Sequence, residues 1–167
     1  MEHLETVDVS YSNRKRPFRM PVQWVNRPDS EFRGFSGLIA GGNISAGDRI
    51  RVLPSGKESV IERIVTYDGD LEGCRENLSV TITLKDEIDA SRGDVLVSAD
   101  SPCGCADQFQ AKILWMSEEP MMPSRQYLLK MGCTTATMTP AKPKHKIDVN
   151  SLELLPTKTL ELNEIGV

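Results

Sequence analysis

Gly56-Lys57 is the first of three short stretches whose residue types do chemistry in other proteins. It resembles the end of a phosphate-binding loop, in which backbone amides and a lysine hold phosphate while a Ser or Thr hydroxyl meets Mg²⁺. Here Glu58 follows the lysine, and Arg51 stands where the first glycine of such a loop belongs. Pro54-Ser-Gly56 is typical of a hairpin turn. We therefore interpret the stretch as a turn between two strands.

Asp70-Leu-Glu-Gly73 formally fits the D-x-x-G pattern of GTP-hydrolysing proteins. A four-residue pattern of this kind recurs by chance, and the sequence contains neither a phosphate-binding loop nor an N-K-x-D guanine-binding motif. We therefore predict that no residue of this chain binds GTP and that none is catalytic.

Cys103-Gly-Cys105 could begin a metal site together with Cys133 or His145. Structural zinc sites normally combine a C-x₂₋₄-C pair with a second clear pair, which is missing here. We predict no metal site and expect the thiols, including that of Cys74, to be free in a reducing compartment. Nucleophilic catalysis would need a base beside the nucleophile, and with His3 near the terminus no credible triad can be assembled.

The composition is that of a globular protein, with 39% hydrophobic and 26% charged residues. The formal net charge of −4 predicts no general attraction to nucleic acid or to an anionic membrane. No apolar run approaches the ~18 residues of a membrane-spanning helix. The opening MEHLETVDVS lacks the basic start and apolar stretch of a secretory signal. We therefore expect a cytoplasmic protein with no membrane partner.

Two basic clusters, Arg14–Arg16 and Lys142–Lys146, raise the question of RNA. Phosphate contacts dominate the affinity for RNA, and unpaired bases stack on aromatic side chains. The acidic net charge and an aromatic content of 5% argue against this function. We interpret both clusters as solvated loops and do not expect nucleic-acid binding.

The elements that would position these residues are strands. Leu78–Leu84 alternates apolar and polar residues, and so do Met20–Trp24 and Phe109–Trp115, as is typical of strands with one buried face. Turn signals recur about every ten residues, which favours a barrel or a sandwich. Further strand candidates are Phe35–Ala40, Arg49–Leu53, Val60–Tyr67, Asp94–Ser98, Gln126–Met131, Lys146–Val149 and the region around Leu160; only His3–Val7 hints at the end of a helix.

Three stretches contain glycines at special backbone positions. Ser45-Ala-Gly-Asp48 and Ser91-Arg-Gly-Asp94 each lead into an apolar strand, and we attribute this likeness to shared turn chemistry with glycine at a positive φ, not to a repeat. Arg33-Gly-Phe-Ser-Gly37 places two glycines in a strand. This is costly unless a bulge, a barrel corner or a close backbone neighbour requires them.

Pro, Gly and Ser collect at Ala99–Cys105, between two strand-rich halves. We therefore predict two small β domains that join near residue 103. The first half holds enough strands to close a barrel. The second, with ~60 residues, lies below the size at which a single core is comfortably stable.

The order of several sequence blocks resembles that of a known family. Pro17-Phe-Arg-Met-Pro-Val-Gln-Trp-Val-Asn-Arg-Pro28 and Phe32-Arg-Gly-Phe-Ser-Gly37 are similar to the start of the second domain in GTPase subunits of bacterial sulfate adenylyltransferases, which are elongation-factor-like GTPases. The further matching blocks are Val52–Gly56, Ile64–Asp70, Asp86–Asp89, Ser91–Asp94, Ala106–Phe109, Glu118–Pro120, Tyr127–Lys130, Ile147–Asn150 and Lys158–Gly166. They follow in the same order over nearly the whole chain.

The resemblance implies an all-β fold: a translation-factor-type β-barrel followed by a second, incomplete β-barrel. Residues 1–16 would be a linker from a GTP-binding domain that this chain lacks, residues 17–102 the domain-II-like barrel, and residues 103–167 a partial domain-III-like barrel. Pro140 and Pro143 interrupt a region similar to a strand of the third domain. Because proline cannot donate to a ladder, that strand is expected to be an edge or to be broken.

The resemblance also implies a role in sulfate assimilation and cysteine biosynthesis. The intact enzyme joins ATP and sulfate into adenosine 5′-phosphosulfate and pyrophosphate, coupled to GTP hydrolysis. In that scheme the catalytic subunit carries the adenylyl chemistry, and the absent domain holds GTP and Mg²⁺. The barrels then supply interdomain and subunit contacts, and this chain needs no cofactor of its own.

Arg33, Phe35 and Arg92 are the residues that we expect to make those contacts. Ion pairs and a capped turn at a domain face explain the mixed charges around Arg92 about equally well. The alternative function is a non-enzymatic, translation-factor-like barrel that binds RNA or a protein partner. In either case an unfinished barrel exposes strand edges that can pair with another chain.

Overall fold

The computed structural model describes residues 16–30 and 32–167. All of its regular elements in these ranges are strands, β1 to β16. The predicted helix end at His3–Val7, the linker up to residue 15 and the basic residues Arg14 and Lys15 lie outside the described residues. The chain divides into two compact units, residues 1–105 and 106–167.

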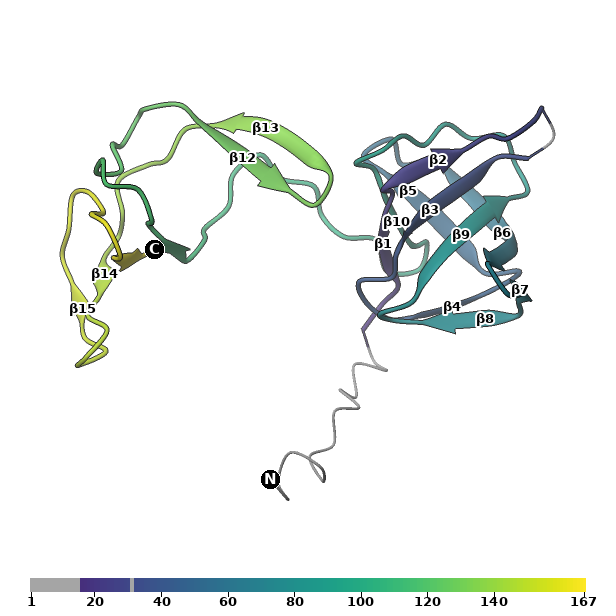
Figure 1. The fold of residues 1–167 in the computed structure, drawn as a ribbon, viewed down its shortest axis with the longest axis horizontal. Helices are drawn as coiled ribbons and strands as arrows, with labels where there is room; N and C mark the ends of the chain where they lie inside the picture. The colour runs from purple at the N-terminus through teal and green to yellow at the C-terminus, as the bar shows by residue number, and fades with distance from the viewer. Residues whose placement is uncertain (1–15, 31) are drawn as a thin grey trace, which may run out of the picture. The chain divides into compact units, whose positions relative to one another are not determined.

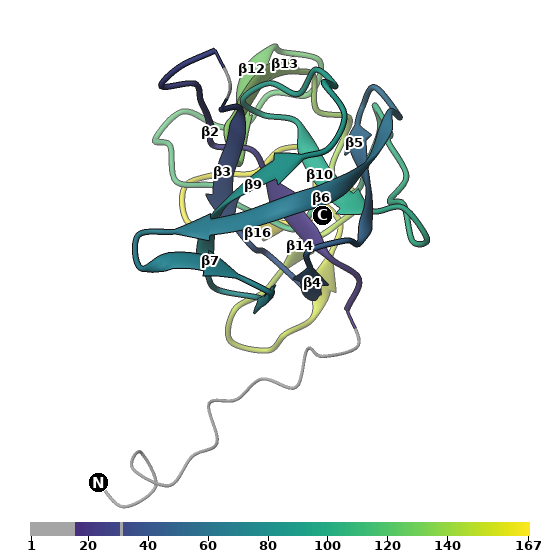
Figure 2. The ribbon, with the colours of Figure 1, turned by 90° about the vertical axis from the view of Figure 1, so that its right-hand side faces the viewer.

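The first unit is a closed barrel (Figure 1; Figure 2 shows its strands turned by 90°). Its main sheet has the order β1-β10-β5-β6-β9-β3-β2, with β7 paired to β6 and a separate β4–β8 pair. Since β1 and β2 follow each other in the chain, the two ends of this order meet. The strands are β1 (Arg19–Pro21), β2 (Trp24–Asn26), β3 (Gly34–Leu38), β4 (Asn43–Ser45), β5 (Arg49–Leu53), β6 (Glu58–Thr66), β7 (Gly69–Leu71), β8 (Gly73–Arg75), β9 (Ser79–Leu84) and β10 (Val95–Ser98).

The barrel closes where β1 crosses β3. The Arg19 amide donates to the Gly41 carbonyl at 3.0 Å, and the Ala40 amide donates to the Arg19 carbonyl at 2.8 Å. Gly37 lies at this crossing: a Cβ built on it would stand 2.3 Å from the carbonyl oxygen of Pro21. A close backbone neighbour, one of the three reasons that we considered, therefore explains this glycine of β3.

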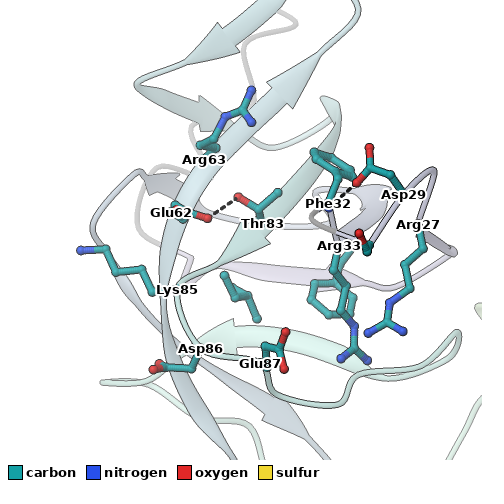
Figure 3. Close-up of a pocket in the computed structure, with 13 residues that line it drawn as sticks. Arg27, Asp29, Phe32, Arg33, Glu62, Arg63, Thr83, Lys85, Asp86 and Glu87 are labelled. Carbon is teal, nitrogen blue, oxygen red and sulfur yellow. Dashed lines mark hydrogen bonds between the residues drawn. The ribbon is translucent and has the colours of Figure 1, made fainter.

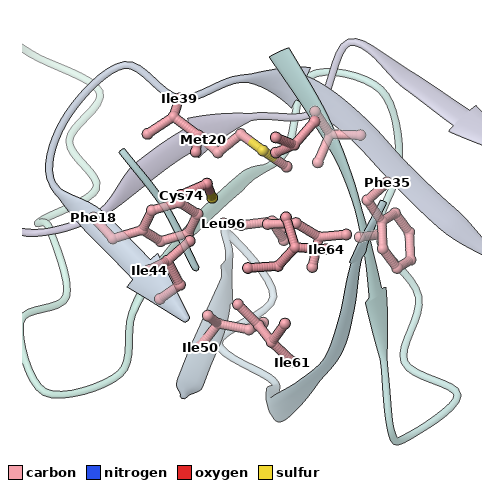
Figure 4. Packing of buried hydrophobic residues seen from close by; sticks show 14 of the residues in the cluster. Phe18, Met20, Phe35, Ile39, Ile44, Ile50, Ile61, Ile64, Cys74 and Leu96 are labelled. Carbon is pink, nitrogen blue, oxygen red and sulfur yellow. The ribbon is translucent and has the colours of Figure 1, made fainter. Parts of the chain in front are cut away.

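Inward-facing side chains of the strands fill the barrel, as Figure 4 shows. Alternation along β9 places Val80 and Ile82 in the core, and β5 does the same with Ile50 and Val52. Burial of such side chains contributes about 1.5–3 kcal/mol each relative to exposure. The core consists of Phe18, Met20, Val22, Phe35, Ile39, Ile44, Ile50, Val52, Ile61, Ile64, Cys74, Val80, Ile82, Ala90 and Leu96.

The two Ser-x-Gly-Asp turns are built alike, which confirms the prediction of shared turn chemistry. The Asp48 carboxylate accepts from the Ser45 amide at 2.8 Å, and the Asp94 carboxylate accepts from the Ser91 amide at 2.9 Å. Gly47 and Gly93 adopt φ values of 92° and 100°. These values lie in the left-handed region that favours glycine.

The second unit has less regular structure. Its strands are β11 (Ile113–Leu114), β12 (Tyr127–Met131), β13 (Thr134–Met138), β14 (Lys146–Ile147), β15 (Leu154–Leu155) and β16 (Ile165–Gly166). They form a four-stranded sheet of order β11-β16-β14-β15 and a separate β12–β13 hairpin. Pro140 and Pro143 lie between β13 and β14, where no strand is assigned. The second unit is thus all-β, as predicted, and its strands form two short, separate sheets.

Several strand predictions need correction. The alternating stretch Phe109–Trp115 forms a strand only at β11, because most of its residues stay exposed and no partner strand runs beside Phe109. Met20–Trp24 is split into β1 and β2. The region around Leu160 contributes a single bridge, to Met121.

Candidate interface on the first barrel

Arg33 immediately precedes β3 and is the centre of the candidate interface. Its Nη2 donates to the Asp89 carboxylate at 2.6 Å. The side chain of Arg33 is 22% exposed and that of Asp89 is 84% exposed. This hydrogen bond, with the positive charge of Arg33, lowers the pKa of Asp89. The pair therefore joins β3 to the loop after β9 and presents an ionised carboxylate to solvent.

The Phe35 ring packs against the guanidinium of Arg33 from the core side of the barrel. The ring lies 5.4 Å from the Arg33 guanidinium carbon, a distance at which a cation and an aromatic face attract each other. Phe35 is only 2% exposed and belongs to the barrel core. It can therefore act in a contact surface only by holding Arg33 in place.

Arg92 lies in the turn before β10, on the same loop as Asp89. Its neighbours fasten the turn to the barrel: the Gly93 amide donates to the Val22 carbonyl at 2.9 Å, and the Val22 amide donates to the Asp94 carbonyl at 2.8 Å. The Arg92 side chain is exposed, and none of the ion pairs within residues 16–30 and 32–167 includes it. The structure brings Arg33 and Phe35 together, and it joins Arg92 to them only through the loop that carries Asp89.

Beside Arg33 a groove of about 500 Å³ opens between the β2–β3 loop, the middle of β6 and the end of β9 (Figure 3). Charges of both signs line it, with Arg27 and Lys85 against Glu62 and Glu87. The Phe32 amide donates to the Asp29 carboxylate at 2.7 Å and shapes one wall. Sequence reasoning did not find this groove, because its lining comes from three separate segments. Such a mixed, open surface suits a protein contact better than a single small ion.

The stretches that resembled nucleotide motifs have structural explanations. Pro54-Ser-Gly56 joins the antiparallel strands β5 and β6, with Gly56 at a φ of 75°. Asp70 lies in β7 and Gly73 in β8, so the D-x-x-G match spans two short strands. The Asp70 carboxylate accepts from Arg63 Nε at 2.6 Å, which lowers the pKa of Asp70.

The cysteines are free thiols, and no cluster of three or more His, Cys, Asp or Glu able to hold a metal occurs in the described part of the chain. Cys74 is buried in the first barrel, and burial raises its pKa to about 11. Cys103 and Cys105 are exposed. Within the described ranges no helix is long and apolar enough to cross a membrane.

Comparison with known proteins shows which family of proteins this chain is similar to. The sequence model of the family described as GTP-eEF1A C-terminal domain-like matches residues 108–167. Over all 167 residues the chain is 47% identical to sulfate adenylyltransferase subunit 1 of Aliivibrio fischeri strain ES114 and covers 35% of that protein. It is 44% identical to the same subunit of Alteromonas mediterranea, covering 36% of it. The chain is a relative of sulfate adenylyltransferase subunit 1.

The relationship to sulfate adenylyltransferase subunit 1 extends to a larger enzyme. The chain is 42% identical over 167 residues to the bifunctional enzyme NodQ of Rhizobium meliloti, of which it covers 26%. It thus spans about a third, or less, of the length of these relatives. The relatives confirm the predicted family and do not favour the alternative of a non-enzymatic, translation-factor-like barrel that binds RNA or a protein partner.

Solved structures with the same fold come from translation factors. Sup35 complexed with GMPPNP aligns with a TM-score of 0.79 at 18% identity, over 99% of this chain and 41% of that one. Elongation factor SelB from Methanococcus maripaludis aligns with a TM-score of 0.70 at 18% identity, over 99% of this chain and 38% of that one. At such identities the likeness concerns the fold alone, and it confirms the translation-factor-type barrel.

Proposed function

We propose that the chain is the barrel region of a sulfate adenylyltransferase GTPase subunit and acts by contact, not by catalysis. The observation that supports this most directly is 47% identity over the whole chain to subunit 1. Its sequence has no phosphate-binding loop and no guanine-binding motif. The barrels therefore serve as surfaces on which other parts of the enzyme assemble.

In the proposed scheme the complete enzyme forms adenosine 5′-phosphosulfate and pyrophosphate from ATP and sulfate during cytoplasmic sulfate assimilation. GTP hydrolysis helps this unfavourable transfer. A partner subunit carries the adenylyl transfer, and GTP and Mg²⁺ bind in a domain outside the 167 residues. The chain itself contributes no group to either reaction.

The contact surface that we propose is the Arg33–Asp89 pair, the exposed Arg92 and the groove beside Arg33. Arg33 is held from below by Phe35 and from the side by Asp89, so little side-chain freedom remains to be lost on binding. Arginine is enriched in protein interfaces because its planar guanidinium bonds carboxylates and packs on aromatic rings.

The test has two parts. The purified chain should hydrolyse no GTP and form no adenosine 5′-phosphosulfate; turnover that follows the protein through purification would refute the contact role. Mixed with the catalytic subunit and the GTP-binding domain of the same enzyme, the chain should co-elute in gel filtration. Arg92→Ala should weaken this association about tenfold, which is typical of an interface arginine. Arg75→Ala on β8, an exposed arginine away from the groove, is the matched control and should leave the association unchanged.

A further inference from the structure

Cys103 and Cys105 form a pair of exposed thiols at the end of the first unit, with only Gly104 between them. The other two cysteines are less accessible. Cys74 is buried in the barrel core, and Cys133 is half-buried in the turn between β12 and β13. Burial raises the pKa of the Cys74 thiol to about 11, so little of its reactive thiolate is present at neutral pH. A reagent in solution therefore reaches the two sulfur atoms of the pair more readily than the other two.

The spacing of the two cysteines suits a disulfide between them. In an extended chain, the Cα atoms of positions i and i+2 lie at most about 7 Å apart. A disulfide joins Cα atoms that are about 4.4–6.8 Å apart. A slight bend at Gly104 therefore brings Cys103 and Cys105 into range, and glycine permits more backbone conformations than residues with a Cβ. A Cβ built on Gly104 meets no atom within 4 Å, so nothing crowds the backbone there.

The backbone that carries the pair is not fastened to the barrel. The last contacts before it are at Ser101, whose carbonyl accepts from the Arg19 guanidinium at 2.5 Å and whose amide donates to the Ser98 carbonyl at 3.2 Å. Among residues 16–30 and 32–167, none of the hydrogen bonds or ion pairs involves residues 102–107. The segment can therefore bend to close a ring without breaking any bond of the described structure.

We propose that Cys103 and Cys105 are a redox-active dithiol that a small-molecule disulfide of the glutathione type oxidises to an internal disulfide. One cysteine, as its thiolate, attacks a sulfur of the small disulfide, forms a mixed disulfide and releases one small thiol. The other cysteine then attacks the protein sulfur of the mixed disulfide, which closes the ring and releases the second small thiol. The two protein thiols lose two electrons and two protons, and the small disulfide takes up both.

The closeness of the two thiols determines which product accumulates. The second attack is intramolecular, and reacting groups held close together react as if they were at very high concentration. The product is therefore the ring and not two mixed disulfides. In reducing compartments such disulfides are usually transient and serve catalysis or redox sensing. The ring is accordingly expected to form when the proportion of oxidised small thiol rises and to open again when it falls.

The experiment exposes the intact chain to oxidised glutathione, alkylates the remaining free thiols and analyses tryptic peptides by mass spectrometry. Residues 93–112 form one tryptic peptide that holds both cysteines, because no lysine or arginine lies between Arg92 and Lys112. This peptide should lose two hydrogen atoms and take up no alkylating reagent. Dithiothreitol should restore both thiols. Cys74 and Cys133 should remain reduced and alkylatable after unfolding.

Two variants and a matched control separate ring closure from general thiol oxidation. Cys103→Ser and Cys105→Ser should each form no ring and should retain one glutathione on the remaining cysteine, since the second attack is lost. Cys133→Ser, which removes a thiol outside the pair, should form the ring as the parent chain does. The proposal would be overturned by a parent chain that stays reduced in excess oxidised glutathione or that accumulates only mixed disulfides. A disulfide that still forms in Cys103→Ser, through Cys133 or Cys74, would overturn it as well.

Discussion

The two units of the chain bury very different amounts of apolar surface. Nearly all buried hydrophobic side chains belong to the first barrel, and only Met121 and Leu160 are buried in the second unit. The second unit instead exposes Phe109, Leu114, Met116, Met122, Leu128, Met131, Val149, Leu152, Leu154 and Leu162. Both units carry strand-forming sequence, so what separates them is closure: a sheet whose ends meet encloses a core. The first unit should therefore hold most of the folding stability.

Gly37→Ala should have the largest effect, because the new Cβ would overlap the Pro21 carbonyl oxygen where the barrel closes. The backbone cannot move aside as the end of a flexible side chain could. We therefore expect the free energy of unfolding of the first unit to fall by about 4 kcal/mol or more. Alkylation of Cys74 during denaturant unfolding reports on this unit alone, since the thiol is buried in its core. Gly104→Ala, with no atom within 4 Å of the added Cβ, should change nothing; an equal loss there would refute the closure argument.

The same truncation in the two units gives the next contrast. Leu96 is 0% exposed in the barrel core and Leu128 is 78% exposed on β12. Leu96→Ala should destabilise the first unit by about 3 kcal/mol through lost burial and a cavity. Leu128→Ala should stay within about 0.5 kcal/mol, as surface changes usually do. Guanidinium unfolding followed by circular dichroism measures both, and comparable losses would mean that the second unit hides a core of its own.

The sequence predicted strands well where alternation coincided with closure. Leu78–Leu84 became β9 because partners on both sides pair with it, namely β3 and β6. Phe109–Trp115 alternates as clearly, yet only β11 forms, since no strand pairs with residues 109–112. Periodicity reports a preference of the chain, whereas a strand also needs a neighbour that lies far away in the sequence.

The candidate interface was only partly accessible to sequence reasoning. Arg33 could be singled out by its motif, but Asp89, its ion-pair partner, stands 56 positions along the chain. The hydrophobic character of Phe35 gave no sign of whether it faced solvent or the core. The pairing of strands across the barrel determines both the partner of Arg33 and the burial of Phe35. This pairing cannot be read from a single sequence.

Leu160→Ala tests the one well-buried leucine of the second unit. Leu160 is 1% exposed and exchanges a backbone bridge with Met121. With so few buried neighbours to lose, the expected cost is about 2 kcal/mol, at the low end for a leucine. Amide exchange in β16 should accelerate while that in β9 stays unchanged. Faster exchange in β9 would show that the two units unfold together and would remove the contrast between them.

The smallest expected effect is a loss of stability at alkaline pH, which depends on whether arginine or lysine pairs with the carboxylates of each unit. The first unit pairs its carboxylates with arginine, as in Arg63–Asp70, whereas Lys146 bonds Glu164 in the second. The hydrogen bond to Glu164 raises the pKa of Lys146 above its ordinary value of 10.5. A raised pKa in the folded state means that the stabilisation is complete below the unfolded pKa and is lost as the pH rises through the folded one. The second unit should therefore weaken slightly above about pH 10.5.

Lys146→Arg isolates this contribution, because arginine stays charged throughout that pH range. Trp115 fluorescence follows the unfolding of the second unit without relying on amide exchange. It should show that the free energy of unfolding falls less at alkaline pH in the variant than in the parent chain. The first unit has a different alkaline group: burial raises the pKa of the Cys74 thiol to about 11, so it too loses stability as the pH rises towards that value. Since Lys146→Arg leaves that thiol untouched, the first unit should respond identically in both proteins. An unchanged alkaline loss in the second unit would show that the Lys146–Glu164 pair contributes nothing to its stability.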